Sequence, residues 1–338
     1  MDRKSAQAKR PSSVDVARLA GVSRATVSAY INGTRYVSPE LGQKIERAIT
    51  ELNYTPDPLA RALKMKDAKT IGLVIPVMSR FYTPIMQAVN EIAHQNQYGF
   101  LLCSSEEDPA REREVLDIFQ AKRISGILLV PCSLDNLDFL RSITSRGTPI
   151  VQINRKITGL DTDSIISDNF NAAHTATKHL IEKGRRHLVL LGFDRRTLSA
   201  NQKKSGFEAA LSDAGLTDAA IIPVKDHDRA DIARAFREFL DSNFPMDGLI
   251  CSTQGKTSVA LDILKERGIS IPDDVSVIGF DDTPWSALLF PPLTVVSENT
   301  HRMGESAATL LMERMEGAKT GPPENIVLED DFIIRAST

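Results

Sequence analysis

The sequence predicts a small all-α head followed by two doubly wound α/β lobes. Short helical patterns separated by turn signals fill residues 12–56. From residue 70 onward, apolar runs of strand length alternate with helical patterns, as in βαβ units with buried parallel strands. These units form two successive series, which indicates two lobes.

The composition is typical of a soluble globular protein. With 338 residues, 42% of them hydrophobic and 25% charged, the chain is long enough for two or three folding units. No apolar run reaches the roughly 20 residues of a membrane span, and the basic start lacks the apolar segment of a secretory signal. We therefore expect a cytoplasmic protein without membrane contact. Cys103, Cys132 and Cys251 fit neither a disulfide framework nor a metal cluster, so we expect reduced thiols.

Charge is distributed unevenly along the chain. Residues 1–66 hold 12 Lys and Arg against 6 Asp and Glu, whereas the remainder holds 29 basic and 38 acidic residues. A basic head on an acidic body indicates that only the head meets a polyanion such as nucleic acid. A solvated basic tail would produce the same imbalance, so charge alone leaves both interpretations open.

The first two predicted helices are separated by a tight turn. Ser12 and Asp15 resemble a capping box, and Gly21 ends the first helix, whose apolar side is formed by Val16, Leu19 and Ala20. Ser23 is a good N-cap for the second helix. Its core face is predicted to comprise Val27, Tyr30 and Ile31, which leaves Arg24, Ala25, Ser28 and Ala29 pointing away from the core.

A third helix braces this pair. Ser38 is its predicted N-cap and Pro39 its first residue, and a buried stripe is formed by Leu41, Ile45, Ala48, Ile49 and Leu52. This arrangement is typical of a helix-turn-helix, whose second helix must keep a small outer face to enter the major groove. A plain three-helix bundle fits the spacing equally well. The following segment, with Pro56, Pro58 and the short helical pattern LARAL, is too brief to be stable without a partner.

The head and hinge are similar to those of LacI-family transcription regulators over the stretch VDVARLAGVSRATVSAYINGTRYVSPELGQKIERAITELNYTPDPLARALK. The core resembles that of the same family in the segments TIGLVIP, DVSVIGFDDTPW and PPLTVV, so the resemblance covers residues 12–335. It implies a basic tail (1–11), a helix-turn-helix DNA-binding domain (12–56), and a hinge helix with its linker (57–69). The remaining residues (70–338) would form a two-lobed, periplasmic-binding-protein-like core for effector binding and dimerisation.

The resemblance also assigns DNA-contacting residues. Arg24, Ala25 and Ala29 occupy positions that read bases. Contacts with phosphates or the groove edge are implied for Thr26, Ser28, Asn32, Tyr36 and Ser38, and a minor-groove wedge is implied for Leu63, followed by Lys64. The family often carries a long polar residue at position 29, whereas the methyl side chain of Ala29 can at most touch a thymine methyl group. Arg24 is then the one long side chain expected to bind guanine O6 and N7.

The core shows little sign of catalytic chemistry. No G-x-G-x-x-G follows the first strand, and the GKT at 255–257 lacks the preceding glycine of a phosphate loop because Ile250 stands there. His174 and His179 are five residues apart, which does not match a helical metal site. We expect no catalytic residues, no metal and no cofactor, although the sequence by itself leaves a hydrolase triad possible.

Residues at strand ends are the better candidates for a ligand site, because doubly wound lobes bind ligands there. The resemblance selects Phe81, Tyr82, Asn154, Asp168, Lys203, His227 and Gln254 as effector contacts, and Trp285 near the cleft. Asp168 has an alternative role as the N-cap of the helix that follows. The family commonly has Asp where Gln254 stands and Arg where Lys203 stands. These departures favour a less negative pocket and predict a sugar or an anionic sugar-like effector.

The function implied is that of a sequence-specific transcriptional regulator. It would act as a repressor, bind a palindromic operator as a homodimer or tetramer, and respond to a small effector that shifts the arrangement of its lobes. Three other classes stay open: a regulator controlled by a protein co-effector, an exported solute-binding protein and a sugar-modifying enzyme. The second would need a signal sequence and no basic head, and the third would need catalytic groups that the sequence does not show.

Overall fold

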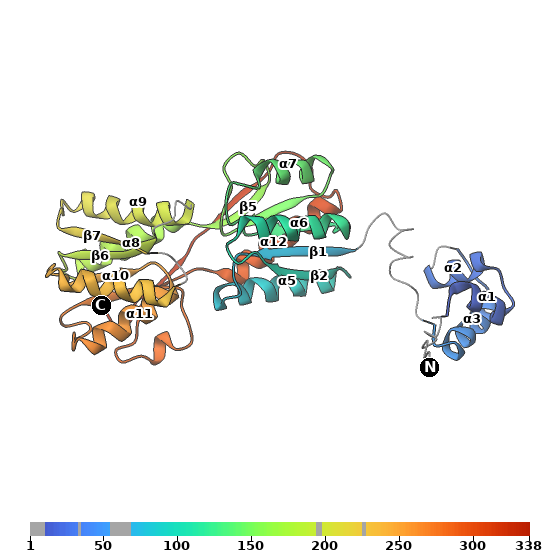
Figure 1. Cartoon of the computed structure of the whole chain (residues 1–338), viewed down its shortest axis with the longest axis horizontal. Helices are drawn as coiled ribbons and strands as arrows, with labels where there is room; N and C mark the ends of the chain where they lie inside the picture. Colours follow the sequence, from blue (N-terminus) through green and yellow to red (C-terminus); the bar gives the residue numbers. More distant parts are fainter. Residues whose placement is uncertain (1–10, 33–34, 55–68, 194–197, 225–227) are drawn as a thin grey trace, which may run out of the picture. The chain divides into compact units, whose positions relative to one another are not determined.

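The computed structural model describes residues 11–32, 35–54, 69–193, 198–224 and 228–338 (Figure 1). The chain divides into two compact units, Met1–Ala68 and Lys69–Thr338. The two units, here called the head and the core, are described separately. Among the helices in the described ranges, none has both the length and the apolar character that crossing a bilayer requires.

The head contains the three predicted helices, α1 (Ser13–Ala20), α2 (Arg24–Asn32) and α3 (Pro39–Glu51). The capping box is present, because the Ser12 amide donates a hydrogen bond of 2.9 Å to the Asp15 carboxylate. Gly21 ends α1 with a φ of 67°, a left-handed conformation that costs glycine little. Ser23 starts α2 by accepting a hydrogen bond of 3.0 Å from the Thr26 amide.

The head core is small and built from short side chains. Its buried members are Val16, Ala17, Ala20, Val27, Ile45 and Ala48. The Tyr30 ring lies directly over Gly42 of α3, and its hydroxyl donates a hydrogen bond of 3.3 Å to Glu46. The prediction that Leu19 lies on the buried side of α1 was wrong, because Leu19 is 46% exposed. Ala17 lies on the buried side instead, where its small side chain lets α1 pack against its neighbours.

The core contains two six-stranded sheets, one in each lobe. The first lobe has the strand order β11-β5-β4-β3-β1-β2, and all its neighbouring strands are parallel. Its strands are β1 (Thr70–Ile75), β2 (Gly99–Ser104), β3 (Gly126–Leu129), β4 (Ile150–Ile153), β5 (Asp163–Ser167) and β11 (Asn325–Leu328). One face is covered by α5 (Thr83–Gln95) and α12 (Thr300–Met315), and the other by α6 (Pro109–Ala121) and α7 (Leu137–Ser145).

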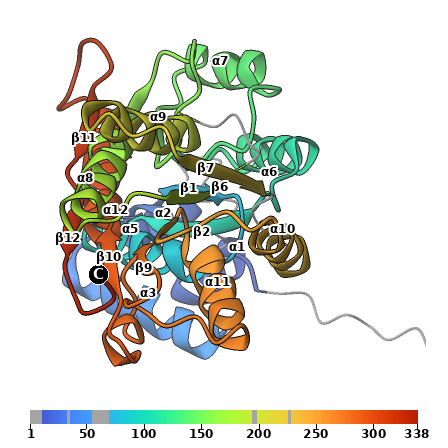
Figure 2. The same cartoon turned by 90° about the vertical axis from the view of Figure 1, so that its left-hand side faces the viewer.

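The second lobe has the order β12-β10-β9-β8-β6-β7, with only β12 antiparallel to its neighbour. Its strands are β6 (Leu188–Phe193), β7 (Ala219–Val224), β8 (Gly248–Cys251), β9 (Ser276–Phe280), β10 (Thr294–Ser297) and β12 (Asp331–Ile333). The sheet lies between α8 (Asn169–Glu182) with α9 (Leu198–Asp213) and α10 (Arg229–Asp241) with α11 (Gln254–Glu266) (Figure 2). Short 3₁₀ turns, η1 (Arg80–Tyr82) and η2 (Ser286–Leu288), precede α5 and follow β9.

The lobes are interleaved along the chain rather than successive. Two successive series were predicted, yet β11, which follows β10 of the second sheet, pairs with β5 in the first sheet. The chain passes between the sheets where β5 leads to α8, where β10 leads to α12 and where β11 leads to β12. The sequence pattern missed this because buried parallel strands look alike whichever sheet they join.

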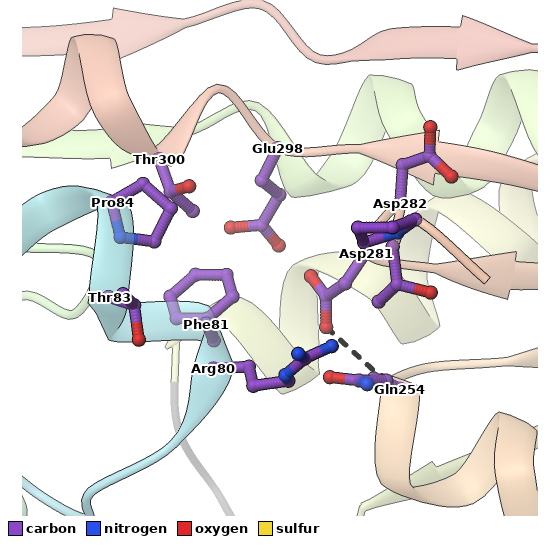
Figure 3. Close-up of a pocket in the computed structure, with 11 residues that line it drawn as sticks. Arg80, Phe81, Thr83, Pro84, Gln254, Asp281, Asp282, Glu298 and Thr300 are labelled. Atoms are coloured by element: carbon purple, nitrogen blue, oxygen red, sulfur yellow. Dashed lines mark hydrogen bonds between the residues drawn. The ribbon is translucent and has the colours of Figure 1, made fainter. Parts of the chain in front are cut away.

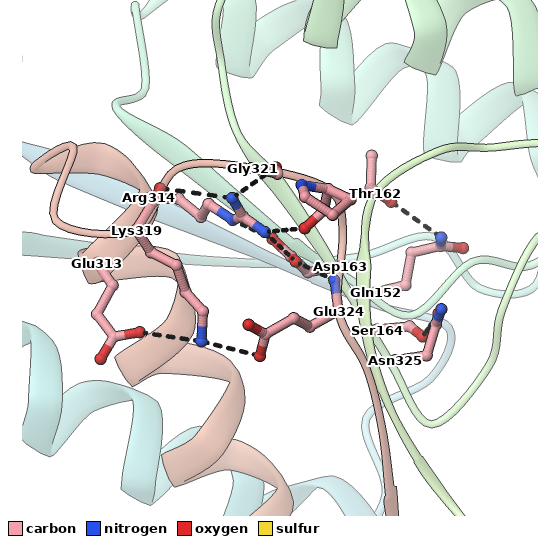
Figure 4. Close-up of polar contacts among 11 residues, drawn as sticks. Gln152, Thr162, Asp163, Ser164, Glu313, Arg314, Lys319, Gly321, Glu324 and Asn325 are labelled. Carbon is pink, nitrogen blue, oxygen red and sulfur yellow. Dashed lines mark hydrogen bonds and ion pairs between the residues drawn. The ribbon is translucent and has the colours of Figure 1, made fainter.

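A buried ion pair fixes the returning strand β11 in the first lobe. Arg314 binds both oxygens of Asp163 at 2.9 and 2.8 Å, and it also donates to the backbone carbonyls of Lys319, Gly321 and Pro322 (Figure 4). The Glu324 amide donates a hydrogen bond of 2.7 Å to the same carboxylate. The hydrogen bond to Asp163 raises the pKa of Arg314 further above its usual value. One carboxylate thus holds both the end of α12 and the start of β11.

We expect Asp163→Asn to lower the free energy of unfolding by about 3–5 kcal/mol, because it leaves the Arg314 guanidinium buried without its counter-charge. Asp138→Asn is the matched control, since the Asp138–Arg141 pair has side chains 95% and 53% exposed and should contribute less than about 1 kcal/mol. Urea denaturation of both variants measures the difference. Equal losses in the two variants would contradict the role assigned to Asp163.

Candidate functional sites

The start of α2 presents an accessible face. Arg24 and Ala25 in its first turn are exposed, whereas Val27 on the opposite side is fully buried. The turn at Gly21 and the Ser23 cap set where the helix begins, so they also set which side chains stand at its N-terminus. A long cationic side chain beside a methyl group, with little else around them, can approach base edges in a major groove.

The other predicted contacts on α2 differ in their exposure. Thr26 and Ser28 are partly exposed, and the Thr26 hydroxyl lies 2.8 Å from that of Ser23. Ala29 was predicted to point away from the core, but it is only 6% exposed. Its single methyl group lies close to the helix backbone, where longer neighbouring side chains cover it easily. A small residue at this position therefore does not leave a free surface for a base.

Tyr36 and Ser38 precede α3. Tyr36 is 84% exposed, which is unusual for an aromatic side chain, and Ser38 occupies the N-cap position of α3. The side chain of Asn32, together with Leu63 and Lys64, lies outside the described residues.

A cavity of about 270 Å³ lies between the lobes of the core (Figure 3). The first lobe contributes the segment after β1, with Arg80, Phe81, Thr83 and Pro84. The second lobe contributes Gln254, Asp281, Asp282, Thr283 and Pro284, and the crossing from β10 to α12 contributes Glu298 and Thr300. The cavity is thus bounded by the carboxyl ends of β1, β9 and β10, where a doubly wound fold is expected to bind ligands.

Glu298 is the most highly connected side chain of the cavity wall. Its carboxylate lies 3.1 Å from the Lys203 ammonium group, and the two side chains are 4% and 8% exposed. Ser167 and Asn154 also donate hydrogen bonds to it, at 3.2 and 3.5 Å. Lys203 further lies 4.0 Å from the centre of the Phe280 ring. The positive charge of Lys203 is therefore neutralised within the wall.

Two further carboxylates line the cavity. Asp281 accepts a hydrogen bond of 3.3 Å from the backbone N–H of Gln254 at the start of α11. Asp282 forms a bidentate pair with Arg335 at 2.7 and 3.0 Å. Figure 3 shows Asp281 and Glu298 directed toward the Phe81 ring. Among the lining residues of the described chain, three are carboxylates and only Arg80 carries a positive charge.

The structure brings together some of the predicted effector residues. Phe81 and Gln254 line the cavity, and Asn154 and Lys203 contact Glu298 behind its surface. Tyr82 is 5% exposed and packs in the core of the first lobe, because consecutive residues of a 3₁₀ turn cannot both face the cavity. Trp285 packs against the core of the second lobe, next to the lining residue Pro284.

Asp168 has the capping role that the sequence also allowed. Its carboxylate accepts hydrogen bonds from the Asn171 amide at 3.2 Å and side chain at 2.6 Å, at the start of α8. It also lines a separate cavity of about 200 Å³ beside Glu329 and Asp330. His227 lies outside the described residues.

Sequence reasoning missed Arg80, Asp281, Asp282 and Glu298. A signal for the acids was present: Asp281 and Asp282 directly follow the buried run of β9, and Glu298 follows that of β10. The prediction of an anionic effector rested on Gln254 in place of an acid together with Lys203 as a cation of the pocket. The Lys203–Glu298 pair removes the second of these grounds.

Within the described residues these sites contain neither a metal cluster nor a thiol of lowered pKa. In the part of the chain that the structure describes, no group of three or more His, Cys, Asp or Glu side chains could hold a metal ion. Burial raises the pKa of the Cys251 thiol to about 12, and burial together with Glu112 does the same for Cys132, so neither is a ready nucleophile.

Two family models match the chain. Residues 14–57 match the bacterial regulatory proteins of the lacI family, and residues 177–338 match a periplasmic binding protein-like domain. The transcriptional repressor PurR of Mannheimia succiniciproducens is 32% identical over 328 residues, which cover 96% of this chain and 97% of that one. The transcriptional regulator KdgR of Bacillus subtilis is 31% identical over 334 residues, with 96% of each chain covered.

Solved structures agree with these matches. The Lac repressor bound to ONPG has a TM-score of 0.85 at 23% identity, covering 98% of this chain and all of that one, which shows the shared fold. The transcriptional regulator CelR in complex with cellobiose has a TM-score of 0.72 at 28% identity and covers 97% of this chain. With a head that matches the family's own model and relatives that share nearly its whole length, the chain belongs to the lacI family of bacterial regulatory proteins and is a DNA-binding transcriptional regulator.

Proposed function

We propose that this regulator is a repressor that binds a palindromic operator as a homodimer in the cytoplasm. Its cleft would take a small, uncharged ligand rich in hydroxyl groups, and that ligand would change operator affinity. The observation that carries the DNA-binding half is the exposed pair Arg24 and Ala25 at the N-terminus of α2. The cavity between the lobes, lined by Phe81 and by the carboxylates Asp281 and Glu298, carries the ligand half.

The proposed DNA interface depends on α2 entering the major groove. Arg24 would form a bidentate contact with a guanine, while Ala25 admits the helix close to the base edges. Exposed Tyr36 and the hydroxyl groups of Thr26, Ser28 and Ser38 would fix the register through the phosphate backbone. One helix reads only a few base pairs, so two heads on half-sites about one helical turn apart are needed for a specific site.

We expect Arg24→Ala to weaken operator binding by about 1–3 kcal/mol and to relax base preference at one position of each half-site. Fluorescence anisotropy on the selected operator, together with a repeated selection from random duplexes, measures both effects. Arg47→Ala, on the exposed side of α3, removes the same charge and controls for general electrostatics. Unchanged base preference in the Arg24 variant would refute direct readout by this residue.

The proposed ligand follows from the charges of the cavity. Asp281 and Glu298 offer carboxylate oxygens, which accept hydrogen bonds from hydroxyl groups. Glu298 and Asp282 are paired with Lys203 and Arg335, so the described lining residues have no surplus cation to bind an anion. The Phe81 ring offers an apolar face against which the carbon skeleton of a sugar can pack. The structure of the similar regulator CelR, described as a cellobiose complex, supports an uncharged carbohydrate here.

We expect neutral mono- and disaccharides, but not sugar phosphates or sugar acids, to raise the melting temperature of the protein. For the neutral ligand that stabilises it, Asp281→Asn should weaken binding by roughly 1.5–3 kcal/mol, because a hydrogen bond to a charged group is lost. The asparagine retains an acceptor for the Gln254 amide, so the start of α11 stays intact. Asp218→Asn, on the exposed surface, is the control.

Two other outcomes of this screen would count against the proposal. Stabilisation by anionic sugars alone would contradict the charge argument. No stabilisation by any sugar, together with capture of a protein that alters operator binding, would favour a regulator controlled by a protein co-effector.

A further inference from the structure

The three crossings between the lobes bring buried polar side chains together. Ser167 lies at the first crossing, Glu298 at the second and Asp330 at the third. Ser167 donates a hydrogen bond to Glu298, and Asn154 of the first lobe and Lys203 of the second do so as well. Any change in the arrangement of the lobes must alter the backbone at these three segments, and therefore the contacts within this group.

Asp330 differs from the rest of this group because an ionised carboxylate in its place would have no cation of its own. Both oxygens of its carboxyl group are buried, and within the described chain neither has a hydrogen-bond partner of normal geometry, since the nearby Ser167 hydroxyl donates to Glu298. Among the described residues, the cation that acts on Asp330 is Lys203, and its ammonium group is bound to Glu298 at 3.1 Å. Two buried carboxylates thus share one cation, and a second negative charge in this position would be costly.

Some of the groups around Asp330 raise its pKa and others lower it. Burial is the largest effect and raises the pKa of Asp330, and the charges of Glu298 and Asp168 raise it further. The Ser167 side chain and Lys203 lower it, and the net result is a pKa of about 7. The adjoining cavity, beside Asp168, Asn171, Thr175 and Glu329, adds no cationic side chain among its described lining residues.

We propose that Asp330 is the residue that gains and loses a proton in the inter-lobe hinge, which is formed by the three crossings and is distinct from the hinge helix of the head. Asp330 is a neutral acid in the lobe arrangement described here, and its ionisation favours a different packing of the three crossings. The inference goes beyond the proposed function, because it concerns the hinge and holds with the cleft empty. Its consequence for operator and ligand affinity, which would then vary around neutral pH, rests on the proposed function.

The sign of the effect follows from proton linkage. An aspartate in the unfolded chain ionises near pH 4, whereas Asp330 in the folded core keeps its proton up to about pH 7. Between these values the folded state binds more protons than the unfolded state. The contribution of Asp330 to stability is therefore fully present below about pH 4 and is lost as the pH rises toward about 7.

The test uses the full chain without operator or ligand. We expect Asp330→Asn, which mimics the neutral acid, to melt at a higher temperature than the wild type at about pH 8 and at the same temperature at about pH 4. Asp331→Asn removes the exposed neighbouring carboxylate and should follow the wild type at both values. A difference between wild type and Asp330→Asn that is the same at both pH values would overturn the proposal.

Small-angle X-ray scattering provides a second test, because a purely local effect of Asp330 would leave the radius of gyration unchanged. The radius of gyration of the wild type should change between about pH 6 and about pH 8, while that of Asp330→Asn should stay constant. A wild-type value independent of pH would contradict a role in lobe arrangement. If neither Asp330→Asn nor the smaller Asp330→Ser folds, the proposal also fails, since it requires a neutral side chain to be accepted. None of these results depends on operator or ligand binding, so failure here leaves the proposed function standing.

Discussion

The buried ion pair between Lys203 and Glu298 joins the two lobes of the core at the point where the chain passes between its sheets. Lys203 belongs to α9 of the second lobe, while Glu298 leads into α12 of the first and also accepts a hydrogen bond from Asn154. The same carboxylate lines the cavity between the lobes. A ligand that engages Glu298 must compete with, or add to, contacts that hold the lobes together. The cleft and the inter-lobe crossings therefore share one residue, Glu298.

Because the chain is interleaved, the two lobes could move relative to each other while each lobe keeps its own structure. Each lobe keeps a complete six-stranded sheet with helices on both faces, so each can rotate as a rigid body. Only the short segments at Ser167, Glu298 and Asp330 must change conformation. The Arg314–Asp163 pair secures β11 to β5 just before the third crossing, so movement there is not absorbed by loosening of the first lobe. A rearrangement of the lobes would thus be confined to the segments that carry the buried polar groups.

Much of this architecture could be predicted from the sequence. Capping signals at Ser12 and Ser23 and the glycine at 21 located the head helices, because these signals act within a few residues. Apolar runs located most strands for the same reason. The sheet to which β11 belongs, and the burial of Ala29, could not be predicted, since both depend on which distant segments pack together. The resemblance to the family selected Phe81, Gln254, Asn154 and Lys203, but the partner of Lys203 required the three-dimensional fold.

Operator affinity with and without the cleft ligand is the measurement that tests the account most directly. The purified protein would be titrated onto its selected palindromic operator, first alone and then in the presence of the stabilising neutral sugar. A ligand that distinguishes two lobe arrangements should change the dissociation constant by at least about fivefold, in either direction, and operator should change ligand affinity by the same factor. Identical operator affinity under both conditions, at saturating ligand, would contradict the claim that the cleft controls the head.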